Sequence, residues 1–183
     1  MATTLHDIPL KTIAGQPASL GDYRGKVLLV VNVASKCGLT TQYAGLEQLY
    51  RAKRDAGLAV LGFPANDFKG QEPGTDAEIQ QFCELTYDVS FPMFAKIGVT
   101  GPGKHPLYQE LTTALPQAVS TTGFDFAGDL RNYGTEPNPE PELLWNFEKF
   151  LISRTGEPVA RFAPDTAPDD PTLIAAIEAE LEK

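Results

Sequence analysis

The chain contains little sulfur and little positive charge. Its 183 residues include only two cysteines, Cys37 and Cys83, and these form no CxxC pair. Neither a disulfide-rich secreted scaffold nor a CxxC thiol–disulfide oxidoreductase is therefore expected. Lys and Arg (15) are outnumbered by Asp and Glu (24), and the formal net charge is −9. This deficit of basic residues argues against binding to nucleic acid or to an anionic membrane surface.

Long hydrophobic runs and targeting signals are also missing. The longest apolar run is far shorter than the roughly 20 residues that a transmembrane helix needs. Residues 1–7 contain neither the basic nor the apolar segment of a secretory signal. We therefore expect a cytoplasmic protein with reduced thiols. The apolar fraction of 42% and the charged fraction of 21% are ordinary for a globular chain, and we expect one domain over residues 1–183.

The order of the predicted elements in the first half indicates an α/β fold. Residues 8–25 are typical of a β-hairpin with its turn near Gly15. Two apolar runs, 26–34 and 58–63, show no polar alternation, which is typical of strands buried on both faces of a parallel sheet. The segment 41–56 between them has helical spacing, so we expect a right-handed strand–helix–strand unit.

The second half predicts further helices and strands around one long insertion. A capping box at 75–78 opens a helix that runs to about Thr86. Apolar spacing predicts strands at 91–94, 145–152 and 159–162, and helices at 107–115 and 173–181. The rest of the Gly-, Pro- and Thr-rich stretch 98–142 is not assigned. This order predicts a thioredoxin-like three-layer α/β/α sandwich with an N-terminal β-hairpin and a long insertion before the final β-hairpin.

Cys37 lies where the first apolar run gives way to a predicted helix. Free N–H groups and the positive end of the helix dipole favour a thiolate at such a position, and Lys36 adds positive charge. A small buried hydrophobic residue is the alternative interpretation. The polar neighbours Ser35, Lys36 and Gly38, and the location at the carboxyl end of a parallel strand, favour a reactive thiol instead.

Cys83 is harder to interpret. Ile79, Phe82 and Cys83 share the apolar stripe of the predicted helix, so their spacing favours a buried core cysteine. The functional alternative is a thiol that forms a disulfide with Cys37 after oxidation. A disulfide requires Cα atoms within about 7 Å of each other, so this alternative needs a local rearrangement of the segment 75–90.

Three neutral donors are candidates to surround Cys37. Gln71 lies in the loop 63–73, at the same expected sheet edge as Cys37, and the pair Trp145 and Asn146 begins a late predicted strand. An ordinary surface loop, and core packing of the only Trp, are the simpler interpretations. If the three side chains converge on Cys37, their N–H groups would stabilise a thiolate and hold the hydroxide that leaves a peroxide.

Three motifs resemble those of the glutathione peroxidase family, and the resemblance extends over essentially the whole chain. The motifs lie at 32–40, 61–73 and 145–150, in the order found in the family. The resemblance implies a thioredoxin fold and an antioxidant peroxidase that reduces hydrogen peroxide and organic hydroperoxides. It implies no metal and no bound cofactor, since a thiol co-substrate supplies the electrons.

The resemblance also assigns roles to individual residues. It implies that Cys37 is the peroxidatic residue, and that Gln71, Trp145 and Asn146 complete the catalytic tetrad. Cys83 matches the resolving cysteine of the thioredoxin-dependent branch, against the interpretation from spacing alone. We therefore expect a Cys37–Cys83 disulfide that thioredoxin reduces, with glutathione as a poorer donor.

The chain departs from the family pattern in three places. Ala65 stands where the second signature usually has a third cysteine, so Cys83 is the only internal partner for Cys37. Asp67 replaces a glutamine, and its carboxylate would oppose thiolate formation nearby. The insertion between Leu107 and Trp145 resembles the long loop of the oligomeric, glutathione-using animal enzymes, which most thioredoxin-dependent members lack.

Other interpretations fit the sequence less well. A peroxiredoxin would need Thr at the position of Ala34. A copper-delivery protein on the same fold would use a distant histidine such as His105, but it also needs paired cysteines. A catalytically inactive binding module is the remaining alternative, and peroxide-dependent oxidation of NADPH through thioredoxin reductase separates it from an enzyme.

Overall fold

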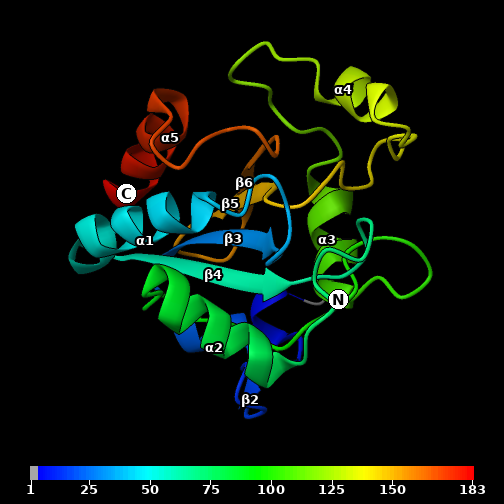
Figure 1. Ribbon diagram of the computed structural model, residues 1–183. Coiled ribbons are helices and arrows are strands. Elements are labelled where there is room, and N and C mark those ends of the chain that lie inside the picture. The colour runs from blue at the N-terminus through cyan, green and yellow to red at the C-terminus, as the bar shows by residue number, and fades with distance from the viewer. Residues whose placement is uncertain (1–3) are drawn as a thin grey trace.

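A four-stranded sheet forms the centre of the computed structural model, which describes residues 4–183 (Figure 1). The strand order is β4-β3-β5-β6. The strands are β3 (Val27–Val33), β4 (Leu58–Pro64), β5 (Lys149–Ile152) and β6 (Pro158–Phe162). β3 and β4 are parallel, with Val27 opposite Leu58, whereas β5 is antiparallel to both β3 and β6. The predicted parallel pair and the final hairpin are thus confirmed.

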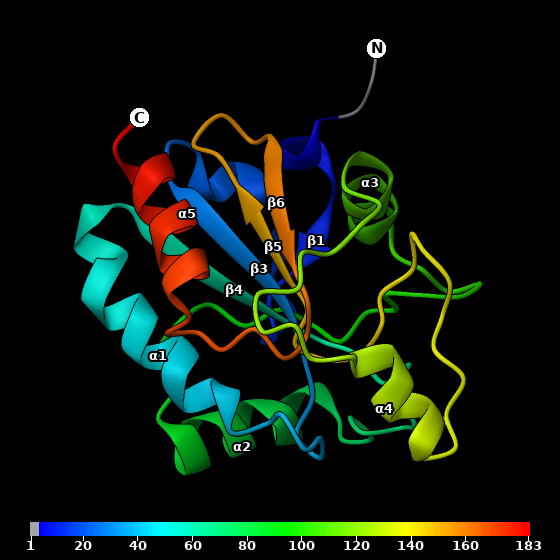
Figure 2. The same ribbon diagram turned by 90° about the horizontal axis from the view of Figure 1, so that it is seen from above.

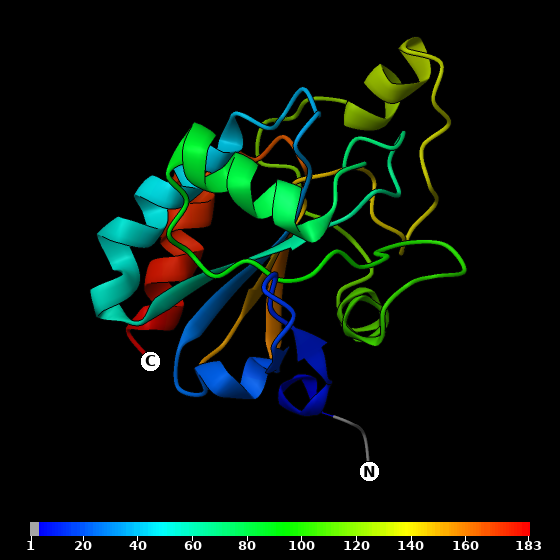
Figure 3. The same ribbon diagram turned by 60° about the horizontal axis from the view of Figure 1, so that its bottom comes forward.

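Helices cover both faces of the sheet. The helices are α1 (Gln42–Lys53), α2 (Asp76–Tyr87), α3 (Pro106–Ala114), α4 (Phe126–Asn132) and α5 (Pro171–Leu181). α1 and α5 lie on one side of the sheet and α3 lies on the other (Figure 2). α2 packs beside α1 (Figure 3). This is the three-layer α/β/α arrangement that the sequence predicts.

Every residue of β3 is buried, which explains the unbroken apolar run. Leu28 and Val30 face the core cluster that includes α3, whereas Leu29 and Val31 face the cluster that includes α1, α2 and α5. A strand with a core on each side gains hydrophobic stabilisation from successive residues, at about 25 cal/mol per Å² of apolar surface removed from water. Polar residues at every second position would remove the hydrophobic contribution of one face of the strand.

The N-terminal hairpin and the predicted helices are also present. The short elements are η1 (Leu5–Asp7), β1 (Leu10–Lys11), β2 (Pro17–Ala18), η2 (Leu20–Tyr23) and η3 (Arg54–Ala56). Gly15 supplies the positive φ of 87° in the hairpin turn. The predicted capping box of α2 forms, because the Thr75 hydroxyl accepts from Glu78 N–H while the Glu78 carboxylate accepts from Thr75 N–H.

Two predictions about secondary structure were wrong. Residues 91–94 form isolated bridges and not a strand, in part because Pro92 has no N–H to donate; its carbonyl accepts from Gly62 N–H at 3.0 Å. Residues 145–148 form a turn, with Phe147 at φ 67°, so the strand begins only at Lys149. The insertion, for which the sequence predicts no element after residue 115, contains the helix α4. Within residues 4–183, no helix is both long and apolar enough to span a membrane.

Candidate active site at the carboxyl edge of β3 and β4

Cys37 lies half-buried in the loop that follows β3. α1 begins at Gln42, so Cys37 precedes the helix and does not occupy its first turn. A tight turn provides the expected donor instead, because Leu39 N–H points at Cys37 Sγ at 3.3 Å. Thr40 fixes this turn: its Oγ1 accepts from Cys37 N–H at 2.9 Å and donates to the Ala34 carbonyl at 2.8 Å. A backbone donor directed at sulfur stabilises negative charge there.

Gln71 and Asn146 meet at this edge of the sheet, as the sequence predicts. Asn146 Nδ2 donates to Gln71 Oε1 at 3.0 Å, and Lys36 N–H donates to the Gln71 carbonyl at 3.0 Å. Gln71 is therefore hydrogen-bonded both to Asn146 and to the residue before Cys37. Because Asn146 occupies Oε1, the NH₂ group of Gln71 is available as a donor to another acceptor.

A buried asparagine on β3 holds the turn that presents Trp145 and Asn146. Asn32 Nδ2 donates to the Trp145 carbonyl at 3.2 Å, and Asn32 Oδ1 accepts from Glu148 N–H at 3.1 Å. Its carbonyl accepts from Phe147 N–H at 2.7 Å. Asn32 is fully buried. Sequence reasoning gave Asn32 no role, although it is the one polar residue within the apolar run of β3.

The indole of Trp145 packs at the same edge. It is 9% exposed and lies against Phe68, with ring centroids 5.2 Å apart. Cys37 packs against the core cluster that contains Trp145. The structure thus joins Gln71 to Asn146 and to the Cys37 loop, with Trp145 next to Asn146 in the same turn; the catalytic roles of these residues stay predictions.

Cys83 is not part of this neighbourhood. It lies on α2, is 1% exposed and packs in the core cluster on the α1 side, which Cys37 also contacts. Both cysteines carry free thiols. Burial raises the pKa of Cys83 to about 11; the nearby Tyr43 hydroxyl lowers it, and the carboxylates of Glu72 and Glu84 raise it further. The apolar spacing correctly indicated a buried position, and the resolving role stays a prediction.

The carboxylate of Asp67 is engaged away from Cys37. Asp67 Oδ2 accepts from Val99 N–H at 2.6 Å. This hydrogen bond compensates part of the negative charge that the sequence analysis expected to oppose a thiolate. Asp67 also lines a small cavity that reaches Phe68 and Trp145.

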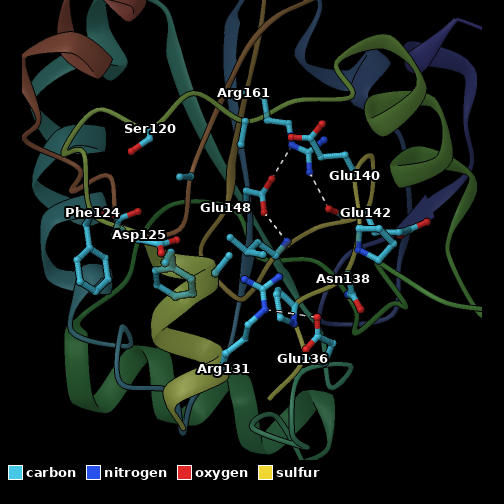
Figure 4. A pocket seen from close by; sticks show the side chains of 18 residues that line it. Ser120, Phe124, Asp125, Arg131, Glu136, Asn138, Glu140, Glu142, Glu148 and Arg161 are labelled. Atoms are coloured by element: carbon cyan, nitrogen blue, oxygen red, sulfur yellow. Dashed lines mark hydrogen bonds and ion pairs between the residues drawn. The ribbon is translucent and has the colours of Figure 1, made fainter. Parts of the chain in front are cut away.

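The insertion lines an open cavity of about 620 Å³, shown in Figure 4. Arg161 and Glu148 form a buried ion pair in its wall. The Arg161 guanidinium also donates to the carbonyls of Leu115, Pro141 and Glu142. Since Glu148 belongs to the turn that Asn32 holds, Arg161 ties the insertion to the site. The sequence signal is two charged residues, Glu148 and Arg161, that flank or interrupt the apolar residues of the final hairpin.

The fold and the half-buried cysteine beside an amide pair define an oxidoreductase with a thioredoxin fold. A thiol:disulfide interchange protein of the thioredoxin family from Chlorobium tepidum superimposes with a TM-score of 0.60 at 15% identity, over 99% of each chain. That similarity shows the fold alone. The family model described as "Glutathione peroxidase" matches residues 5–112. The chain belongs to the glutathione peroxidase family, and it is a peroxidase.

Similar proteins support this assignment over nearly the full length. The thioredoxin/glutathione peroxidase BtuE of Escherichia coli (strain K12) is 48% identical over 95% of each chain. The hydroperoxy fatty acid reductase gpx1 of Synechocystis sp. is 43% identical over 98% of this chain and 95% of its own. The crystal structure of GPX1 from T. cruzi superimposes with a TM-score of 0.69 at 28% identity, over 98% and 97% of the two chains.

Proposed function

We propose that the protein reduces hydrogen peroxide and organic hydroperoxides through Cys37, and that thioredoxin is its main reductant. The observation that carries this proposal is the bond between Asn146 and Gln71, together with the bond between Gln71 and the Cys37 loop. Together they join two neutral amide side chains to the loop that carries a half-buried thiol, at the edge of a thioredoxin-fold sheet. The names of the BtuE and gpx1 relatives support both the substrate class and the reductant.

In the first step, the Cys37 thiolate attacks the terminal peroxide oxygen and the O–O bond breaks. The product is a sulfenic acid, and water or an alcohol leaves. Leu39 N–H stabilises the sulfur anion, while the amides of Gln71 and Asn146 and the Trp145 indole donate to the departing oxygen. Donors already held in place need no reorganisation as charge develops. Sulfur carries the electrons, so the proposal includes no bound cofactor.

In the second step, the Cys83 thiol condenses with the sulfenic acid and releases water. Cys83 must move from its buried position, and α2 is lightly anchored, since Ile79 and Cys83 are its only buried residues. Leu85 on the same helix is 78% exposed. Segments with few buried contacts open at low free energy. Ala65 leaves Cys37 no other internal thiol.

Reduced thioredoxin then exchanges with the Cys37–Cys83 disulfide and restores both thiols. We place this cycle in the cytoplasm, where thioredoxin is kept reduced. Glutathione is the secondary donor, because a monothiol needs two successive attacks for the same exchange.

Parallel assays with the two donors test the proposal. Hydrogen peroxide or an organic hydroperoxide is added to the protein with thioredoxin, thioredoxin reductase and NADPH, or with glutathione, glutathione reductase and NADPH. We expect faster oxidation of NADPH with thioredoxin, and a Cys37–Cys83 disulfide by mass spectrometry after treatment with peroxide alone. Equal or faster turnover with glutathione, or a product without that disulfide, contradicts the proposed cycle.

A further inference from the structure

Glu72 is a buried carboxylate to which the reaction described above gives no task. It follows Gln71 directly and is 1% exposed. Its backbone is fixed on both sides, since its N–H donates to Asn66 Oδ1 at 2.9 Å and its carbonyl accepts from Lys96 Nζ at 2.8 Å. Neither carboxylate oxygen has a hydrogen-bond partner among residues 4–183. A buried carboxylate without a partner is costly for folding, so it calls for an explanation.

Within the described part of the chain, two buried hydroxyl groups near Glu72, those of Ser35 and Tyr43, also lack a hydrogen-bond partner. The hydroxyl and N–H of Ser35 approach the Glu72 carboxylate without reaching hydrogen-bond geometry. The Tyr43 hydroxyl approaches the Cys83 thiol in the same way. Glu72, Ser35, Tyr43 and Cys83 therefore form a buried polar cluster.

This cluster contains Cys83 and reaches the Cys37 loop through Ser35. Glu72 lines a cavity of about 370 Å³, one wall of which is Ser35 and Lys36 from the Cys37 loop. α2 also lines this cavity, through Ile79 and Phe82. α2 also carries Cys83, so a carboxylate is held where the helix and the loop must meet when the disulfide forms.

The condensation of Cys83 with the sulfenic acid requires an acid–base group. A thiol attacks as its thiolate, and burial holds the pKa of Cys83 at about 11, which leaves almost none of it ionised at neutral pH. The hydroxide that leaves the sulfenic acid must also acquire a proton. One acid–base group that takes the first proton and delivers the second satisfies both needs.

We propose that the Glu72 carboxylate accepts the proton of the Cys83 thiol and passes it to the oxygen that leaves Cys37. This proposal rests on the proposed function. The Cys83 S–H bond breaks, the sulfur–sulfur bond forms and the sulfenic S–O bond breaks. Glu72 is protonated and then deprotonated, so the net reaction is one thiol plus one sulfenic acid giving one disulfide and one water. Tyr43 lies beside Cys83 as a relay for the proton.

The charges around the cluster fit this task. Burial raises the pKa of Glu72, while Ser35, Lys96 and Lys36 lower it. The net effect is a raised pKa, closer to neutral pH than that of an exposed glutamate. Such a pKa suits a group that both takes and gives a proton.

Glu84 offers a matched control for Glu72. It lies on α2, is exposed, and like Glu72 raises the pKa of Cys83 by its charge. If charge were the whole effect, Glu72→Gln and Glu84→Gln would both ease ionisation of Cys83 and speed disulfide formation. Loss of a proton acceptor predicts the opposite sign for Glu72→Gln alone.

Rapid-quench mass spectrometry of the full-length reduced protein, mixed with excess hydrogen peroxide, tests the proposal. It follows the reduced, sulfenic and disulfide forms, and Trp145 fluorescence provides a second record. We expect Glu72→Gln to form the sulfenic acid at the wild-type rate and then the disulfide at least about tenfold more slowly. Glu84→Gln forms the disulfide at the wild-type rate or faster. An unchanged or faster disulfide step in Glu72→Gln overturns the role of Glu72.

The pH profile separates an acid–base role from a structural one. In the wild type, the disulfide step slows as pH falls through the raised pKa of Glu72; in Glu72→Gln this acid limb disappears and the rate rises steadily with pH. If Glu72→Gln also loses the first step, Glu72→Asp carries the test, and its acid limb must remain. A wild-type protein that forms no sulfenic acid contradicts the proposed function itself, whereas an acid limb retained in Glu72→Gln contradicts only this inference.

Discussion

The surroundings of the two cysteines differ in almost every respect. Cys37 is half-buried in a loop, and Leu39 N–H points at its sulfur. Cys83 is 1% exposed on a helix, among apolar side chains and near two carboxylates that raise its pKa. The first environment directs a hydrogen-bond donor at the sulfur, whereas burial and nearby carboxylates oppose ionisation of the second thiol. A chain with two thiols can thus keep one reactive and the other protected until the first has been oxidised.

Replacing Cys37 by Ser should have the largest effect on activity. A hydroxyl at this position ionises far less readily than a thiol, so no sulfenic acid forms. We expect peroxide-dependent NADPH oxidation to fall to the background rate with every donor. Cys83→Ser is the control, because it keeps the reactive thiol and should still consume about one equivalent of peroxide. Residual turnover in Cys37→Ser would mean that the buried thiol can react with peroxide directly.

Replacing Cys83 by Ser should remove turnover with thioredoxin and leave the first step intact. Without a resolving thiol, the sulfenic acid persists and is exposed to further oxidation. We expect a trapped sulfenic acid by mass spectrometry and faster inactivation at high peroxide. If Cys83→Ser keeps full activity with thioredoxin, the contrast between the two cysteines has no functional meaning and Cys83 is a core residue.

The fold was predictable where a pattern is local. The unbroken apolar runs of β3 and β4 and the capping box of α2 each depend on residues close together in sequence. The helix α4 was missed because it is short and lies in a Gly- and Pro-rich insertion, where the Asp125 cap is its main signal. Residues 91–94 have strand-like composition, but Pro92 limits them to isolated bridges.

The supports of the candidate site could not be predicted from the sequence. Motif resemblance indicated Gln71, Trp145 and Asn146; the structure joins Asn146 to Gln71 by a hydrogen bond, and their catalytic roles stay predictions. The role of Asn32 depends on a turn more than a hundred residues later in the chain. Likewise, nothing in the local sequence shows that Glu72 is buried, because α2 and the Cys37 loop cover it only in the folded chain.

Removing the charge of Glu148, which belongs to the turn with Trp145 and Asn146, should lower the free energy of unfolding. In Glu148→Gln, Arg161 stays buried and loses its carboxylate partner. Leaving one member of a buried ion pair uncompensated costs about 3–5 kcal/mol. Urea unfolding at neutral pH measures this loss. Glu178→Gln, which removes an exposed partner of Lys53, is the control and should cost less than about 1 kcal/mol. Equal losses would mean that the buried pair does not stabilise the insertion.

Replacing Asn146 by Ala should slow the first step by about a hundredfold, as removal of one preorganised donor does elsewhere. The bond to Gln71 is lost, so the Gln71 side chain is no longer held by Asn146. Stopped-flow measurement of sulfenic acid formation gives the rate, and disulfide formation should keep its own rate. Gln48→Ala, an exposed amide on α1, is the control. A change confined to the disulfide step would mean that Asn146 serves the reaction of Cys83 and not the attack of Cys37 on peroxide.

The smallest expected effect is on the pH dependence of stability, to which Lys149 and Cys83 should contribute with opposite signs. Lys149 begins β5, is fully buried, and burial lowers its pKa to about 7. Between about pH 7 and the unfolded value of 10.5, the unfolded chain binds a proton that the folded chain does not, so stability rises with pH. The pKa of Cys83 is raised from 9.0 to about 11, so its contribution falls with pH over that range.

Urea unfolding at pH 7 and pH 9 measures the Lys149 response, and unfolding at pH 9 and about pH 11 measures the Cys83 response. Relative to Lys149→Met, the wild type should gain about 1–2 kcal/mol over the first interval, since each pH unit is worth up to about 1.4 kcal/mol per proton. Relative to Cys83→Ser, the wild type should lose stability above pH 9. A wild-type curve parallel to that of Lys149→Met would mean that Lys149 stays charged through its bonds to Gln42 Oε1 and the Pro164 carbonyl.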